Sequence, residues 1–228
     1  LRDFDLNTVS GNINFLIVKT SDLEVIKDLN IPENFVLILN STNEHFMPDM
    51  RAFFMKNHFS KNPIILSQSY DFNYSDKLIV HSSTDNGGLF IQGFGDGIFI
   101  DNNSSDIKEI KKINNLSFKI LQAARVRVTS TDFISCPSCG RTLFDLQKTT
   151  AIIRERTDHL KGLKIGIMGC IVNGPGEMAD ADYGYVGSGK DKITLYRGQD
   201  VVKRGINFKY GVDELVNLIK DDGNWIEP

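Results

Sequence analysis

The sequence predicts an α/β protein built from two domains, and three observations support this class. Short apolar runs alternate with helical stretches through the first half of the 228-residue chain, a pattern typical of a mainly parallel sheet covered by helices. The pattern changes near residue 125, where apolar and polar residues alternate, and all three cysteines lie beyond this point. We therefore predict a β-α repeat domain over residues 1–124 and a smaller α+β domain over residues 125–228.

The first half contains four apolar runs that read as buried strands. They occupy residues 15–18, 35–39, 63–66 and 97–100. The segments that follow them predict helices over residues 21–29, 49–59, 76–84 and 106–124. The apolar side of the second helix is expected to carry Met50, Phe53, Phe54 and Met55. Four such units are too few for a closed eight-unit barrel, which takes about 250 residues, so we predict a partial barrel or an open parallel β-α layer.

The second half predicts a smaller mixed domain. Residues 125–130 read as a strand that leads into the first cysteine, and residues 142–160 as a helix with Leu143, Leu146 and Ile153 on one face. Residues 164–168 predict a buried strand that places Cys170 at its carboxyl end, the usual position for binding groups in α/β structures. The remaining elements are expected to be antiparallel strands and a terminal helix, at residues 183–186, 192–196, 201–202 and 213–220.

Composition excludes several classes of function. The net charge of -3 argues against a large phosphate-backbone contact, so nucleic acid is not an expected partner. No apolar run approaches the roughly 20 residues that span a bilayer. An odd number of cysteines, two of them in a Cys-x-x-Cys pair, disfavours a disulfide framework and favours a reducing interior. Because the chain begins at Leu1, we expect it to be a piece of a longer protein.

The cysteines predict a metal site that takes its last ligand from another residue type. Cys136 and Cys139 form the close pair, Cys170 follows later, and Glu177 lies beyond a Gly-Pro-Gly turn. Sulfur ligands select iron-sulfur clusters, zinc or copper(I), and a carboxylate leaves one position weakly held and open to exchange. Zinc ribbons and dithiol redox pairs also use Cys-x-x-Cys, so zinc and a redox dithiol remain alternatives at this point.

Three further features surround these ligands. We expect Gly174 and Gly176 to adopt positive φ, so that the turn bends toward the metal. Asn173 is a candidate for contacting ligand or substrate, and Arg141 for holding negative charge. A set of basic residues in the antiparallel region is a candidate surface for an acidic electron donor, with an ordinary hydrated face as the simpler alternative: Lys190, Lys192, Arg197, Lys203 and Arg204.

Residues 135–147, 167–187 and 202–206 together carry a close resemblance to a known family. They resemble the 4-hydroxy-3-methylbut-2-enyl diphosphate synthases of the non-mevalonate isoprenoid pathway. The resemblance covers residues 125–228, and the preceding half, including residues 93–97, looks like the extra domain in the long form of that family. The amino-terminal barrel of the family has no counterpart in this chain.

The resemblance implies a cofactor, a reaction and partners. It makes Cys136, Cys139 and Cys170 the thiolate ligands of a 4Fe-4S cluster and Glu177 the carboxylate ligand of the fourth iron. The implied reaction is the two-electron reductive ring opening of 2-C-methyl-D-erythritol 2,4-cyclodiphosphate, with electrons from reduced ferredoxin or flavodoxin. Glu177 and Asn173 are the implied catalytic residues, and Arg141 is a further residue at the cofactor.

The family's diphosphate-binding residues lie largely in its barrel, so this chain alone is expected to bind the cluster with little turnover. The implied location is a bacterial cytoplasm, with a plastid interior as the alternative. The rival function is a non-catalytic interaction module stabilised by zinc or a cluster.

Overall fold

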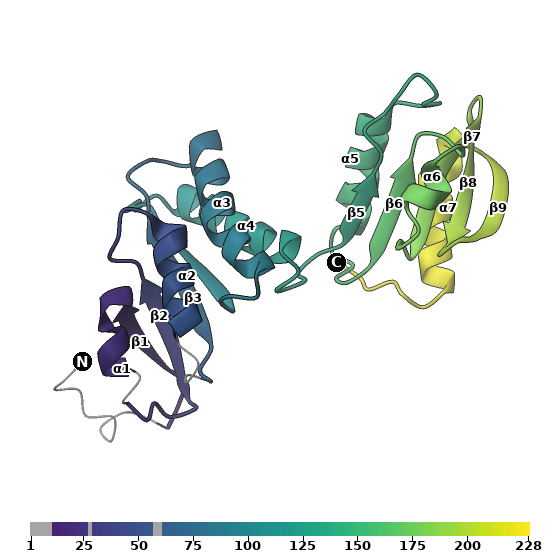
Figure 1. The fold of residues 1–228 in the computed structure, drawn as a ribbon. Helices are drawn as coiled ribbons and strands as arrows, with labels where there is room; N and C mark the ends of the chain where they lie inside the picture. Colours follow the sequence, from purple (N-terminus) through teal and green to yellow (C-terminus); the bar gives the residue numbers. More distant parts are fainter. Residues whose placement is uncertain (1–10, 27–28, 57–60) are drawn as a thin grey trace. The chain divides into compact units, whose positions relative to one another are not determined.

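The chain separates into two compact units, each with its own hydrophobic core. The computed structural model describes residues 11–26, 29–56 and 61–228 (Figure 1). The first unit covers Leu1–Arg127 and the second Val128–Pro228. The first unit is α/β, as predicted, and the second combines helices with a mixed parallel and antiparallel sheet, in agreement with the predicted α+β domain.

The first unit is built on a four-stranded parallel sheet in the order β1-β2-β3-β4. All four strands predicted from apolar runs are confirmed. Their bounds are Asn14–Lys19 for β1, Phe35–Asn40 for β2, Ile64–Ser69 for β3 and Gly97–Asp101 for β4. The described strands form an open layer, in agreement with the predicted partial barrel or open β-α layer.

Helices cover one face of this sheet. They are a short 3-10 turn at Thr20–Asp22, then α1 at Leu23–Ile26, α2 at Phe46–Lys56, α3 at Asp76–Ile91 and α4 at Ile107–Ala123. The predicted helix over 21–29 extends into residues 27–28, and the one over 49–59 into residues 57–60, which lie outside the described residues. The apolar face predicted for α2 is confirmed at Met50 and Phe53 but is wrong at Met55, whose side chain is 62% exposed.

The opposite face of the sheet is apolar and largely uncovered. Leu16, Val18 and their neighbours in register point into the helix-covered core, whereas Phe15, Ile17 and Phe99 are 53–62% exposed. The alternation follows from the pleat, which directs successive side chains to opposite faces. Parallel sheets are normally covered on both faces, so the exposed side is a surface suited to packing against further polypeptide.

The strand predicted over residues 125–130 is wrong, because this segment closes helix α4 instead. Arg125 has a φ of 59°, in the left-handed region. Its N–H bonds the carbonyl of Gln122, and the N–H of Val126 bonds that of Leu121. This pair of bonds is a Schellman motif, which usually carries glycine at the left-handed position. Because an arginine occupies that position, the sequence gives no signal for the helix end. The strand begins later, at Asp132.

The second unit holds a five-stranded mixed sheet in the order β5-β6-β7-β8-β9. Strands β5, β6 and β7 are parallel, and β8 and β9 continue as antiparallel neighbours. The bounds are Asp132–Ser135, Lys164–Met168, Tyr183–Gly189, Lys192–Arg197 and Asp200–Asn207. Three helices complete the unit: α5 at Leu146–Thr157, α6 at Gly174–Glu177 and α7 at Phe208–Asp221.

Helix α5 begins later than the predicted residue 142. Asp145 caps it by accepting a hydrogen bond from the N–H of Lys148, and the residues before the cap belong to the cysteine loop. Leu143, placed on the helix face by the sequence, lies in that loop and is 43% exposed. Leu146 and Ile153 pack into the core, as predicted.

Among the described residues, no helix has both the length and the apolar character needed to cross a membrane.

Candidate functional site

Two neighbouring parallel strands bring the three cysteines to one edge of the second sheet. β5 ends at Ser135, directly before Cys136, and β6 ends at Met168, two residues before Cys170. The strands pair in register, with Ser135 opposite Ile167. Since carboxyl ends of parallel strands share one edge, both cysteines emerge at the same edge. We call this edge the cysteine edge.

A pocket at the cysteine edge gathers every site residue that the sequence predicts. Its volume is about 180 Å³. Its lining comprises the predicted residues Cys136, Cys139, Cys170, Glu177, Asn173 and Arg141, together with Pro137, Ser138 and Gly174. Cys136 and Cys170 are half-buried, whereas Cys139, Asn173 and Glu177 are exposed. The pocket therefore opens to the surface of the unit.

Thr142 holds the Cys-x-x-Cys loop in shape. Its hydroxyl accepts a hydrogen bond from the N–H of Cys139 at 3.0 Å and lies 3.0 Å from the hydroxyl of Ser138. Its own N–H donates to the carbonyl of Cys139 at 2.9 Å. Ser138 has a φ of 68°, so the loop reverses direction at this residue. These bonds keep the two cysteines of the pair on one tight turn.

Gly169 ties that loop to the third cysteine. Its N–H donates to the sulfur of Cys136 at 3.3 Å, and its carbonyl accepts from the N–H of Leu143 at 3.1 Å. A Cβ at Gly169 would lie 2.8 Å from the side chain of Thr142, so only glycine allows this approach. The residue before Cys170 is thus bonded to both ends of the cysteine loop.

The Gly-Pro-Gly-Glu segment is one turn of helix rather than the predicted bend. It forms α6, with Pro175 in the first turn, where a missing N–H costs no hydrogen bond. The positive φ predicted for Gly174 and Gly176 is wrong, since neither residue lies in the left-handed region. Gly174 is needed for another reason: a Cβ there would lie 2.7 Å from the Cβ of Met168. This close packing sets α6 against β6 and brings Glu177 to the pocket.

Arg141 brings a positive charge to the pocket. A backbone hydrogen bond from Arg141 is the largest cause that lowers the pKa of the Cys139 thiol, and its guanidinium adds a hydrogen bond and its charge. In return, the hydrogen bond to Cys139 raises the pKa of Arg141, with contributions from the charges of Cys170 and Glu177. A lowered thiol pKa favours the thiolate, which is the metal-binding form of cysteine.

The chemistry of these donors fits a metal or an iron-sulfur cluster. Three sulfurs and one carboxylate surround a single pocket, and a guanidinium offsets their negative charge. The side chains are not drawn into a closed coordination shell: within the described residues, no three His, Cys, Asp or Glu side chains form a group able to hold a single metal ion.

The sequence analysis did not single out Thr142 and Gly169, which hold the cysteine loop in place through hydrogen bonds. The signal for Thr142 is its position three residues after Cys139, since a threonine hydroxyl readily bonds nearby backbone groups in turns. The signal for Gly169 is only its place before Cys170, and nothing local distinguishes it from other glycines at strand ends.

The site defines a class: an α/β domain that carries the donors of a metal or iron-sulfur centre at the carboxyl edge of its sheet. Residues 132–221 match the family model described as the GcpE protein C-terminal domain. This segment includes all six residues of the pocket that the sequence singles out.

The chain matches the carboxy-terminal portion of 4-hydroxy-3-methylbut-2-en-1-yl diphosphate synthases. The flavodoxin-type synthase of Porphyromonas gingivalis is 43% identical over 95% of this chain, which covers 37% of that protein. That of Parabacteroides distasonis is 42% identical over 99% of the chain and 36% of the relative. The chloroplastic, ferredoxin-type synthase of Arabidopsis thaliana is 53% identical over 68% of the chain and 20% of the relative. The chain thus spans little more than a third of these relatives at most.

Proposed function

We propose that this chain is the reductase portion of a 4-hydroxy-3-methylbut-2-enyl diphosphate synthase. The complete enzyme would convert 2-C-methyl-D-erythritol 2,4-cyclodiphosphate to 4-hydroxy-3-methylbut-2-enyl diphosphate by a two-electron reduction. The observation that carries the proposal is the pocket in which Cys136, Cys139 and Cys170 meet Glu177. The relatives are named as ferredoxin- or flavodoxin-type synthases, which supports redox chemistry at that pocket.

In this proposal the four residues hold a 4Fe-4S cluster, the cysteines through sulfur and Glu177 through oxygen. A bound cluster supplies single electrons and an iron that acts as a Lewis acid. A carboxylate is a harder ligand than a thiolate and is exchanged more easily at a soft metal. Glu177 is exposed and lines the pocket, which supports its role as the exchangeable ligand that gives way to substrate.

Two other polar side chains of the pocket, Arg141 and Asn173, would bind and orient the substrate. Arg141 lies within electrostatic reach of Cys139, Cys170 and Glu177, so its guanidinium offsets the negative charge that thiolates and a diphosphate bring together. Asn173 is exposed at the start of α6 and lines the same pocket. Its amide is free to orient an oxygen of the substrate by donating a hydrogen bond.

The partners follow from the same proposal. Reduced ferredoxin or flavodoxin delivers the electrons, and an amino-terminal barrel in the complete enzyme binds the cyclic diphosphate. The uncovered apolar face formed by Phe15, Ile17 and Phe99 supports further polypeptide packing on the first unit. The relatives are bacterial and chloroplastic, so we assign the protein to a bacterial cytoplasm or a plastid interior.

The proposal is tested by the metal content of the chain. After anaerobic reconstitution we expect about four irons and four sulfides per chain and a paramagnetic resonance signal on reduction. Glu177→Ala should keep the fold and change that signal, because the fourth iron loses its protein ligand. Asp180→Ala is the matched control, since Asp180 is also exposed and acidic but does not line the pocket.

Two results would contradict this function. One zinc per chain without sulfide would replace the redox role by a structural metal site. A Glu177→Ala spectrum identical to that of the parent chain would remove the carboxylate from the ligand set and leave an interaction module as the better account.

A further inference from the structure

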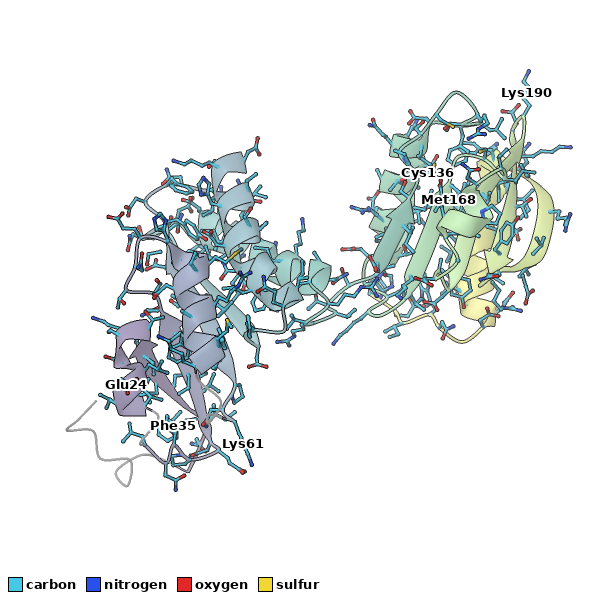
Figure 2. All side chains as sticks on the ribbon, in the orientation of Figure 1. Glu24, Phe35, Lys61, Cys136, Met168 and Lys190 are labelled. Atoms are coloured by element: carbon cyan, nitrogen blue, oxygen red, sulfur yellow. The ribbon has the colours of Figure 1, made fainter. Side chains whose placement is uncertain are left out.

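The cysteine edge of the second unit carries a cationic flank beside the pocket. Lys190 lies in the turn between β7 and β8, Lys192 begins β8, and Lys209 lies in the first turn of α7. All three are exposed. In the part of the chain that the structure describes, none of them forms an ion pair. Figure 2 shows Lys190 projecting from the end of the unit where Cys136 lies. We call Lys190, Lys192 and Lys209 the cationic flank.

The topology explains why these lysines lie at the same edge of the sheet. β7 runs parallel to β6 and ends at the cysteine edge, so the turn to β8 lies there as well. β9 returns to the same edge, where Asn207 pairs with Lys192 and α7 begins. The N–H of Phe208 donates to the carbonyl of Asp191 at 2.9 Å, which joins the start of α7 to the β7–β8 turn.

Direct packing connects the flank to the cysteine loop. The rings of Phe144 and Phe208 lie 5.5 Å apart, so the end of the cysteine loop packs on the residue before Lys209. On the strand side, a Cβ at Gly187 would lie 2.4 Å from the carbonyl oxygen of Gly169. The last residues of β7 are therefore in close contact with the residue before Cys170.

Exposed apolar side chains also lie close to the pocket residues in the chain. Leu143 is 43% exposed, Ile171 50% and Val172 61%. Ile171 and Val172 lie between the pocket residues Cys170 and Asn173, and Leu143 lies two residues after Arg141. An apolar centre with a charged rim is the usual anatomy of a protein interface. Weak electron-transfer encounters use small surfaces of this kind.

At this edge, lysine and arginine side chains outnumber the carboxylates. Asp191 lies in the turn itself, and Asp145 caps α5. Glu177 belongs to the pocket, and Glu214, one turn further along α7, pairs with Lys203. The basic residues at the same edge are the cationic flank, Lys148 at the start of α5, and Arg141. The opposite edge differs: Asp182, Asp200 and Asp222 surround a single arginine, Arg197, in one recess.

We propose that the cationic flank docks a small acidic redox protein with its electron-carrying group over the apolar centre beside Cys139 and Cys170. This inference rests on the proposed function, and it assigns the electron donor's binding surface. Opposite charges accelerate association and set the orientation of the encounter, whereas the short apolar contact allows rapid release. Of the five basic residues predicted as a docking surface, the proposal keeps Lys190 and Lys192. Arg197 lies at the far edge, Lys203 is paired with Glu214, and Arg204 lies within β9 rather than at the cysteine edge.

The test uses the reconstituted chain and flavodoxin as the probe. In the triple variant Lys190→Glu, Lys192→Glu, Lys209→Glu, we expect oxidised flavodoxin to bind at least about tenfold more weakly at low ionic strength. High salt should reduce the difference, because it screens exposed charges. The control variant carries the same change in net charge at exposed lysines elsewhere: Lys108→Glu, Lys111→Glu, Lys161→Glu.

A second readout separates this proposal from the function on which it rests. Reduced flavodoxin should reduce the triple variant more slowly than the parent chain, whereas dithionite should reduce both at the same rate, with one electron passing to each cluster. If the chain forms no cluster, the proposed function is overturned. Flavodoxin binding can still be measured in that case, and it tests the docking proposal separately.

Three outcomes would overturn the docking proposal. One is unchanged flavodoxin binding by the triple variant. Another is an equal loss of flavodoxin affinity in the control variant, which would show that binding depends on net charge and not on the position of the lysines. The third is unchanged flavodoxin binding with weakened binding of inorganic pyrophosphate, which would assign the flank to a phosphate group instead.

Discussion

Gly174 and Gly176 flank one proline in the sequence, yet the structure predicts opposite effects when each is replaced by alanine. Gly174 is buried, and an added Cβ would lie 2.7 Å from the Cβ and 3.1 Å from the Cγ of Met168. Met168 is 1% exposed, and its Cβ is fixed by the backbone of β6, so it cannot rotate away. An added Cβ at Gly176 meets nothing within 4 Å.

The magnitudes follow from these contacts. Overpacking a buried position costs about 1–3 kcal/mol, so Gly174→Ala should destabilise the second unit by that amount. Gly176 has a helical backbone and open space, where alanine is favoured over glycine by about 0.5–1 kcal/mol. Gly176→Ala should therefore be neutral or slightly stabilising.

The measurement is denaturant unfolding followed by the fluorescence of Trp225. It is the only tryptophan of the chain, and its ring packs at 5.0 Å from that of His159 in the second unit. The signal therefore reports this unit separately from the first, which matters because a chain of two units need not unfold in one step. Iron content after reconstitution is the second readout: it should fall for Gly174→Ala, which displaces α6 and Glu177, and remain unchanged for Gly176→Ala.

Equal unfolding midpoints for the two variants would refute this reasoning. Such a result would mean that α6 moves away from β6 without cost, and that the position of Glu177 does not depend on the contact between Gly174 and Met168.

Two further predictions concern the loop and an ion pair. Thr142→Val should lower cluster retention against a chelator about tenfold, because the N–H of Cys139 loses its acceptor, whereas Thr142→Ser should retain it. Asp222 accepts a hydrogen bond from Arg197 at 2.7 Å, and that bond lowers the pKa of its carboxyl below the ordinary 3.8. The stability it contributes is thus present above the unfolded pKa and is lost as pH falls through the folded one. Asp222→Asn should destabilise the chain at neutral pH and progressively less in acid, and Asp221→Asn, a neighbouring exposed acid, should show no such trend in denaturant midpoints.

The sequence predicted strands well and the ends of helices poorly, for physical reasons. Runs such as Phe35–Asn40 are apolar at every core-facing position, so they read as strands without further information. Helix ends depend on single residues. Arg125 adopts the left-handed conformation that usually requires glycine. The alternation of valines and polar residues after it therefore predicted a strand instead of a helix end. Met55 follows buried Phe53 on α2 but points to solvent, because a helix turns by about 100° at each residue.

The side chains proposed as ligands could be predicted from the sequence, whereas the residues that hold them in place could not. Sulfur and carboxylate side chains are common metal ligands, so their residue types alone predict a metal site. The structure brings the three cysteines and Glu177 together in one pocket. Thr142, Gly169 and Gly174 act through backbone bonds and close packing, which depend on which strands are neighbours. No single-residue property separates Gly174 from Gly176.

Charge placement depends on topology in the same way. Successive turns of an antiparallel ribbon alternate between the two edges of a sheet, so basic residues close in sequence can face opposite ends of a domain. The β7–β8 turn brings Lys190 and Lys192 to the cysteine edge, while the β8–β9 turn places Arg197 beside Asp222 at the other edge. The end of the second unit that holds the cysteines therefore carries the exposed lysines on which the proposed docking of an electron donor depends, whereas Asp182, Asp200 and Asp222 line the recess at the other end.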